Sequence, residues 1–240
     1  MQNHILSSLS SEDRSSLLAN LEEVELKSRQ ELEQPDHQID YAYFIEAGIA
    51  AVLLVSGKDR IALGLIGCEG ASGIALFLGN SQSPHSTVML TAGRAFRIRT
   101  DDLQTAMEQR GELKRLLLRY SLAFYNQTAH TALSNAMTVM EQRVARWVLM
   151  THDRFAGNTV PLTHEIISYM LGARRAGVTE ALNKLQANKL IQVARGSIHV
   201  LDRKGIEALA GHFYGIPEKE FVRLVGTFWP PILPDIANGV

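Results

Sequence analysis

Short apolar runs and longer helical patterns divide this 240-residue chain into distinct segments. Residues 24–98 contain brief runs rich in β-branched and aromatic side chains, such as YAYFIEAG and RAFRIR, separated by turns containing Pro, Gly, Asn or Asp. Many short strands at near-regular spacing predict a jelly roll or barrel of roughly 75 residues. Ahead of it, SSEDRSSLLANL predicts a short helix capped near Ser10 or Ser11.

Helical spacing replaces the strand pattern after Thr100, and the apolar stripe that follows predicts one long helix over residues 112–138. The stripe is long for a helix lying on one small domain, so we expect parallel pairing with a second copy to bury it. Gln127 and His130 interrupt the stripe, and they either set the register of the pair or face away from the partner. The predicted dimerisation residues are Leu113, Leu117, Tyr120 and Phe124.

Two short helices hinged at a glycine are predicted by THEIISYMLGARRAGVTEALNKL, after a further helical run, MEQRVARWVLMTHDRF. Thr163 offers an N-cap for the first helix, and Gly172 suits a turn that needs a positive φ. The second helix starts at about Arg174 and buries Val178, Ala181, Leu182 and Leu185. LIQVARGSIHVLD then predicts a hairpin, so the order of elements is that of a winged helix-turn-helix.

The second of these helices carries candidate chemistry on its polar face. Such a helix reads base edges in the major groove with its first two turns, and an arginine there can bond guanine at two points. We expect base contacts from Arg175, Ala176, Thr179 and Glu180, although Glu180 can instead pair with Lys184 and face away. Contacts to phosphate, which set register only, are expected from Thr163, His164, Arg174, Arg195 and Ser197.

The distribution of charge agrees weakly with a DNA contact at one end. Residues 139–215 hold ten Lys and Arg against six Asp and Glu, a net charge of +4, while residues 1–138 carry −4. With 46% hydrophobic residues and a mean hydropathy of −0.02, the composition is that of a globular protein, with no stretch long and apolar enough for a membrane span. The polar first residues lack a secretory signal, so we expect a cytoplasmic location.

Nearly the whole chain resembles a transcriptional regulator of the Crp/Fnr family. The resemblance is most specific in LTHEIISYMLGARRAGVTEALNKLQANKLIQVARGSIHVLD, which has the family's Leu-Thr pair, turn glycine, recognition-helix arginine and Arg-Gly-x-Ile wing. It implies an α+β fold with a cyclic-nucleotide-binding-like β-roll (1–111), a dimerisation helix (112–138) and a winged helix-turn-helix (139–215). Residues 216–240 would hold the end of the last helix and a Pro-rich tail.

The resemblance also implies function. Arg175 matches the guanine-reading arginine of the family, double-stranded DNA and a second copy of the chain are the expected partners, and RNA polymerase is a further one. Two departures stand out, because Ala176 replaces a common glutamate and Glu180 replaces a second arginine. We therefore expect a half-site different from the best-known operator of the family.

The sensor region departs further from the resemblance. No Lys or Arg lies between Arg60 and Arg94, so a cyclic phosphate would have no cation to pair with, and we do not expect cyclic AMP or cyclic GMP to bind in the usual way. Haem or another effector is the alternative, and neither cofactor nor metal is expected otherwise. The candidate effector pocket comprises Gly67, Cys68, Glu69 and His85.

Two other classes of function are alternatives to a DNA-binding regulator. An enzyme would use Cys68 as nucleophile and His85 as base, but no phosphate loop, paired metal ligands or third orienting residue supports it, and we predict no catalytic residues. A winged helix that binds protein instead of DNA is the other alternative. The exposed arginines and the basic C-terminal part favour DNA.

Overall fold

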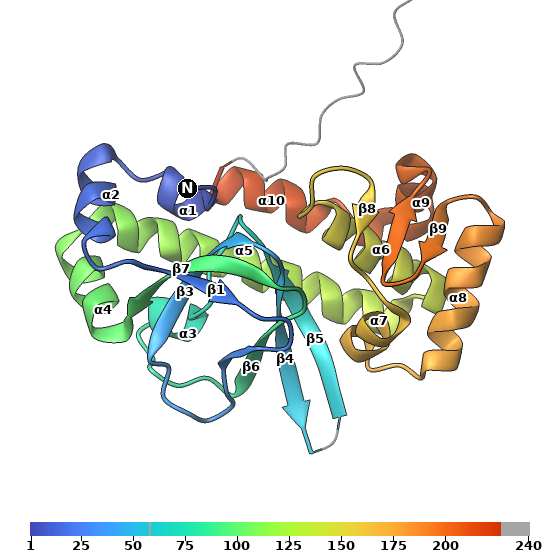
Figure 1. The fold of residues 1–240 in the computed structure, drawn as a ribbon, viewed down its shortest axis with the longest axis horizontal. Coiled ribbons are helices and arrows are strands. Elements are labelled where there is room, and N and C mark those ends of the chain that lie inside the picture. The colour runs from blue at the N-terminus through green and yellow to red at the C-terminus, as the bar shows by residue number, and fades with distance from the viewer. Residues whose placement is uncertain (58, 227–240) are drawn as a thin grey trace, which may run out of the picture.

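Two antiparallel sheets form the roll in the computed structural model, which describes residues 1–57 and 59–226. One sheet has the strand order β1–β7–β3 and the other β2–β6–β4–β5 (Figure 1). Apolar side chains from both sheets meet in one cluster that includes Ile45, Val52 and Met89. The predicted jelly roll is thus confirmed. Its strands are β1 (Glu22–Leu26), β2 (Glu31–Glu33), β3 (Tyr41–Ala47), β4 (Ala50–Ser56), β5 (Asp59–Ile66), β6 (His85–Met89) and β7 (Gly93–Arg99).

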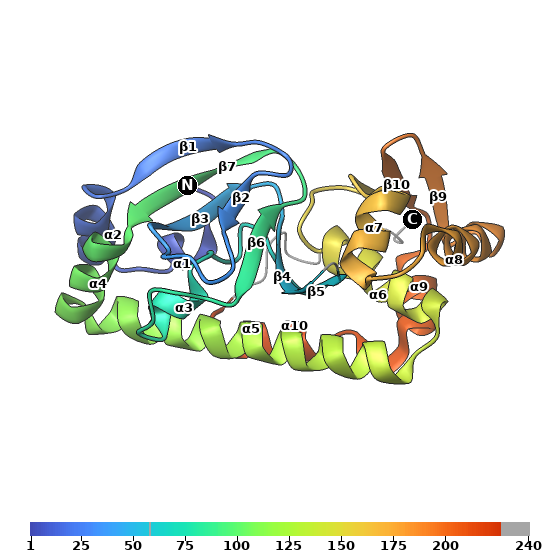
Figure 2. The same cartoon turned by 90° about the horizontal axis from the view of Figure 1, so that it is seen from below.

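Short helices flank the roll at the end away from the winged helix-turn-helix (Figures 1 and 2). The Ser10 hydroxyl accepts from the Asp13 amide and caps one of them, as its sequence predicts. Apolar side chains of these helices pack with the roll and with the next, much longer helix. The short helices are α1 (His4–Ser7), α2 (Ser11–Leu18), α3 (Ile74–Phe77) and α4 (Thr100–Gln109).

The long helix α5 (Gly111–Met137) runs beneath the roll and continues to the winged helix-turn-helix (Figure 2). Its length agrees with the predicted helix, but the predicted dimerisation face is wrong. The four residues assigned to that face are buried inside the protomer, where they pack on the roll and its short helices. They are Leu113, Leu117, Tyr120 and Phe124, none more than 7% exposed.

A second apolar face of α5 explains the difference. Leu118, Leu122 and Tyr125 are 41%, 47% and 66% exposed, on the side of α5 away from the roll. The stripe of leucines seen in the sequence therefore belongs to two faces, of which the roll covers one. Only the outer face is available to a second copy of the chain.

Gln127 attaches α5 to the roll. Its side-chain oxygen accepts from the Leu65 amide at 2.8 Å and its nitrogen donates to the Leu65 carbonyl at 3.2 Å. The residue is 9% exposed, and it sets the register of α5 on β5 rather than that of a helix pair. His130, the other polar residue of the stripe, is half-buried, and burial followed by the charge of Arg146 lowers its pKa.

The C-terminal third is a winged helix-turn-helix built on α6 (Met140–His152). The first helix of the motif is α7 (His164–Leu171), the second is α8 (Arg175–Ala187), and β9 (Ile191–Ala194) and β10 (Ser197–Val200) form the wing. The short strand β8 (Thr159–Val160) pairs with β10, and α9 (Arg203–Ala210) packs against α6. None of the helices in the two described ranges is long and apolar enough for a membrane crossing.

The segment after α9 differs from the prediction that the last helix ends within residues 216–240, ahead of a Pro-rich tail. That helix ends at Ala210, a 3₁₀ turn (Gly211–Phe213) follows, and a separate helix α10 (Ile216–Leu224) returns to pack on α5 (Figure 1). Phe221 lies edge-on to Tyr120 with ring centroids 6.3 Å apart. The Pro-rich part of the tail, 227–240, lies outside the described residues.

Replacing Gln127 by Ala should lower the free energy of unfolding by about 1–3 kcal/mol, because the buried Leu65 amide loses its partner. Urea unfolding followed by circular dichroism measures the change, with Gln104→Ala on the exposed side of α4 as control. A Gln127→Ala midpoint equal to that of the control would contradict this role.

Candidate nucleic-acid interface

The turn of the helix-turn-helix forms as its sequence predicts. The Thr163 hydroxyl accepts from the Ile166 amide at 3.1 Å and caps α7. Gly172 ends α7 with φ of +57°, a conformation that side chains other than glycine rarely adopt. A Cβ at this position would also lie 3.1 Å from the Arg60 carbonyl oxygen of β5. The glycine therefore serves both the turn and the close approach of the motif to the roll.

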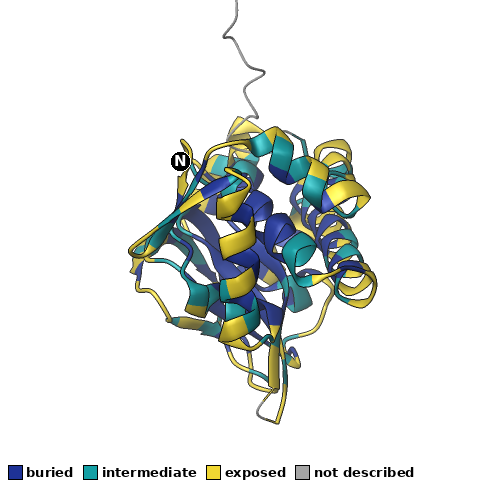
Figure 3. Cartoon of the chain, turned by 90° about the vertical axis from the view of Figure 1, so that its right-hand side faces the viewer, coloured by how far each residue is buried: buried dark blue, intermediate teal, exposed yellow. Residues whose placement is uncertain are grey.

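The recognition helix α8 buries the predicted face and exposes the other one. Its apolar residues Val178, Ala181, Leu182 and Leu185 are all at most 1% exposed. Arg175 and Ala176 in its first turn are exposed, and Thr179 one turn later is half-buried. Arg174 precedes the helix as its N-cap and is exposed as well. Figure 3 views the molecule from this end and shows exposed helix surfaces around a buried interior.

Glu180 takes the alternative arrangement in which it pairs along its own helix. Lys184 lies 3.0 Å from its carboxylate and 2.6 Å from that of Glu141 on α6. These pairs are largely exposed, and exposed pairs contribute little to stability. They nonetheless hold the Glu180 carboxylate toward Lys184.

The wing carries one more exposed cation. Arg195 and Gly196 form the turn between β9 and β10, where Ala194 pairs with Ser197, and Gly196 has a positive φ of 84°. No hydrogen bond or ion pair in the described ranges involves the side chains of Arg174, Arg175 or Arg195. Three unpaired arginines are thus presented by the N-terminus of α8 and by the wing.

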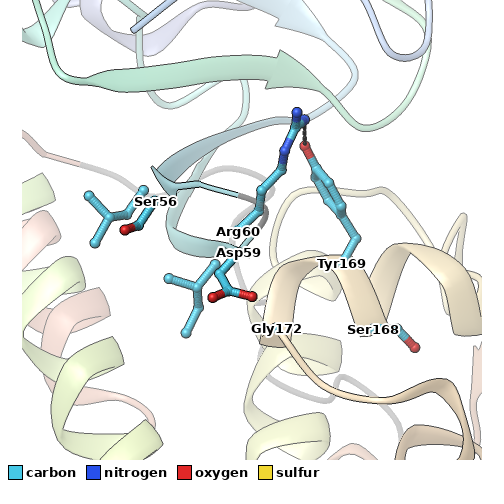
Figure 4. Close-up of a pocket in the computed structure, with 8 residues that line it drawn as sticks. Ser56, Asp59, Arg60, Ser168, Tyr169 and Gly172 are labelled. Atoms are coloured by element: carbon cyan, nitrogen blue, oxygen red, sulfur yellow. Dashed lines mark hydrogen bonds between the residues drawn. The ribbon is translucent and has the colours of Figure 1, made fainter.

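A cleft of about 580 Å³ separates part of the roll from the first helix of the motif. The β4–β5 hairpin lines one side and α7 the other (Figure 4). The Arg60 guanidinium donates to the Tyr169 hydroxyl at 3.3 Å across it, and an exposed ion pair joins Arg29 to Glu165 at 2.7 Å. Contacts at two points therefore hold α7 beside the roll.

A buried ion pair also connects the two parts, which share one apolar cluster. Arg154, just after α6, lies 2.8 Å from the Glu69 carboxylate of the roll, and each side chain is 2% exposed. Burial acts to lower the pKa of Arg154, but Glu69 and other carboxylates outweigh it and raise the pKa. The guanidinium also donates to the Leu65 carbonyl at 3.3 Å, the same carbonyl that accepts from Gln127. Roll, α5 and α6 therefore meet at Leu65.

Gly67 belongs to this connection. Its amide donates to both oxygens of the Glu69 carboxylate at 3.1 Å. A Cβ on Gly67 would come within 2.7 Å of one of those oxygens and 3.0 Å of the Arg154 side chain. A side chain at this position would therefore displace one or both members of the ion pair.

Three of the residues predicted as an effector pocket share the turn after β5, but His85 lies apart from them. Ala50 of β4 pairs with Ile66, next to the turn of Gly67, Cys68 and Glu69, whereas Leu54 of the same strand pairs with His85. Four residues of strand separate these positions, about 13 Å. His85 contacts Ser83 instead, at 3.3 Å, and burial lowers its pKa. The grouping of His85 with the turn is therefore wrong.

The thiol of Cys68 is buried beside this ion pair. Burial, followed by the negative charge of Glu69, raises its pKa to about 12. A reactive or metal-binding cysteine needs the thiolate, so this environment is that of an inert thiol.

Sequence reasoning missed Arg154, the bonds of Gln127 to the roll and the contact of Lys184 with Glu141. Arg154 and Glu69 are 85 positions apart, and no local pattern links them. An arginine directly after a helix is normally expected to be exposed to solvent. The one available signal was the glycine-glutamate spacing of Gly67 and Glu69, which was interpreted as a ligand site.

Native Cys68 should resist iodoacetamide at pH 8 and react at once when the protein is unfolded in urea, because burial keeps the thiol protonated. Intact-mass spectrometry reports the single adduct. Rapid modification of the folded protein would contradict the buried, protonated thiol and revive a reactive cysteine.

The sequence matches the Crp-like helix-turn-helix domain over residues 142–209. A comparison with curated proteins gave no match.

Solved structures share the fold over most of the chain. FixK2 from Bradyrhizobium japonicum has a TM-score of 0.70 at 16% identity, with 80% of this chain and 98% of that one covered. A Crp/Fnr family regulator from Eubacterium rectale has a TM-score of 0.68 at 17% identity, covering 86% and 97%. The c-di-GMP responsive regulator CLP from Xanthomonas campestris has a TM-score of 0.63 at 15% identity, covering 80% and 99%. The chain therefore carries a Crp-like helix-turn-helix domain within the fold of Crp/Fnr regulators, which are transcription regulators.

Proposed function

We propose that the protein is a homodimeric transcriptional regulator that binds double-stranded DNA in the cytoplasm with α8 in the major groove. The observation that carries the proposal is the exposure of Arg174, Arg175 and Arg195 without partners in the described ranges, on a winged helix-turn-helix that matches the Crp-like domain. Unpaired guanidinium groups suit both phosphates and guanine edges. The comparisons support DNA binding, whereas the dimer and the individual contacts are part of the proposal.

The proposed roles of the side chains follow from their positions. Arg175 bonds guanine, and the methyl group of Ala176 contacts thymine or leaves that base unread. Arg174, Arg195 and the half-buried Ser197 hold phosphates on either side. Glu180, which pairs with Lys184, contributes less to base reading than its position on the helix alone implies.

Dimerisation on the outer face of α5 fits the spacing of its exposed residues. These small and apolar positions follow one another at intervals of four and three, which is the seam of a two-stranded coiled coil. Two recognition helices carried by such a pair can reach half-sites about 34 Å apart. The seam consists of Leu118, Leu122, Tyr125, Ala129, Ala132 and Ala136, all exposed in the protomer.

The roll, in this proposal, does not hold a cyclic nucleotide in the usual way. Glu69, the carboxylate best placed by sequence to receive a ribose, already binds Arg154 and the Gly67 amide. The buried Cys68 thiol also makes a poor axial ligand for haem, because the ligand is the thiolate. An effector of another kind and a contact with RNA polymerase stay predictions.

Substituting Arg175 by Ala should weaken binding to the selected operator by about 1–3 kcal/mol and relax the choice of one base. Arg195→Ala should instead weaken all sequences alike and reduce the slope of log affinity against log salt by about 1. Fluorescence anisotropy at several salt concentrations separates the two. Identical effects of both substitutions on selected and scrambled DNA would overturn the assignment of Arg175 to a base.

Leu122→Glu should convert the dimer to a monomer and abolish cooperative binding to paired half-sites, because it places a charge in the proposed seam. Sedimentation equilibrium gives the assembly state. Gln104→Glu, on the exposed side of α4, adds the same charge elsewhere and serves as control. A Leu122→Glu protein that still sediments as a dimer would place the interface on another surface.

A further inference from the structure

A histidine–threonine hydrogen bond joins the two helices of the motif at the predicted DNA surface. The Nδ1 atom of His164, the first residue of α7, lies 2.9 Å from the hydroxyl of Thr179 on α8. Both side chains are half-buried, so the bond is partly shielded from competing water. Thr179 stands four residues after Arg175, which places it on the same face of α8 one turn later.

This bond selects one orientation of the Thr179 side chain. A threonine in a helix commonly divides between two rotamers, one of which directs its hydroxyl to a carbonyl of the preceding turn. Here the hydroxyl points to His164, so its oxygen keeps one defined partner and the methyl group takes another staggered position. A hydroxyl that rotates freely can bond several bases, whereas a fixed one presents a single pattern.

We propose that His164 is a positioning residue for base reading: by fixing the rotamer of Thr179, it determines the base preferred at the base pair that Thr179 meets. The inference rests on the proposed function and assigns His164 a role other than phosphate binding. It concerns one base pair only, because no hydrogen bond in the described ranges links His164 to the side chain of Arg175.

The chain contains a matched control for this chemistry. Thr159 of β8 and His199 of β10 form the same type of bond, hydroxyl to Nδ1, at 3.0 Å. It lies in the sheet of the wing, away from α8. Removing His199 therefore tests the loss of a histidine–threonine bond from the same domain without touching the recognition helix.

The experiment selects operators from a library of randomised half-sites with the full-length protein and its variants. His164→Ala and Thr179→Val should each reduce discrimination at one and the same base pair about fivefold or more, which is within the range of a single base contact. Combining them should add nothing further, since His164 acts through Thr179. His164→Asn should restore much of the preference, because its amide offers a polar atom near the position of Nδ1. His199→Ala should leave the selected sequence unchanged.

The guanine preference assigned to Arg175 distinguishes this inference from the proposed function. This preference should persist in the wild-type protein and in all five variants. A wild-type protein that selects no sequence would overturn the proposed function, and this inference with it. His164→Ala could instead keep the guanine preference, weaken binding to all sequences alike and reduce the slope of log affinity against log salt by about 1. That result would make His164 a phosphate contact and overturn this inference alone. Loss of the guanine preference in His164→Ala would show that the bond places the whole helix, which also overturns it.

Discussion

The buried ion pair between Glu69 and Arg154 is the interaction on which the arrangement of the molecule depends. Two charges taken out of water are costly, and each needs the other to be tolerated. The pair satisfies this requirement with one partner from the roll and one from the DNA-binding part. Movement that separates the two side chains while they stay buried would leave each charge without its partner. The orientation of the winged helix-turn-helix is therefore coupled to the turn after β5.

Helix α5 has two apolar faces, of which the roll covers the inner one and leaves the outer one exposed. Its inner face, with Tyr120 and Gln127, completes the core of the roll and bonds to Leu65. Because Arg154 donates to the carbonyl of the same residue, α5 and α6 are held on one strand of the roll. A dimer formed on the outer face would thus set the positions of both recognition helices through a connected series of contacts.

The winged helix-turn-helix was largely predictable because its signals are local. Thr163 caps the helix it precedes, Gly172 supplies the positive φ of the turn, and the apolar spacing of α8 identifies its buried face. The exposed face of α5 was not predictable from one helix, since Leu117 and Leu118 are equally apolar and only the roll decides which is covered. The Glu69–Arg154 pair could not be read either, because it joins residues far apart in the chain.

His164 illustrates the same limit within the candidate site. Its place at the start of α7 predicts a phosphate contact, whereas the bond to Thr179 exists only once the two helices pack together. Spacing along the chain predicts which face of a helix is presented. Contacts between helices decide in which rotamer each side chain is presented, and this determines the pattern offered to a base.

A salt titration of ligand-free protein, binding to DNA from upstream of its own gene and to a scrambled fragment of equal length, tests whether the buried ion pair already holds the two parts in a DNA-binding arrangement. We expect tight binding to the upstream fragment and much weaker binding to the scrambled one, because the ion pair holds the two parts in place without an effector. Weak binding to both fragments with equal dependence on salt would contradict it.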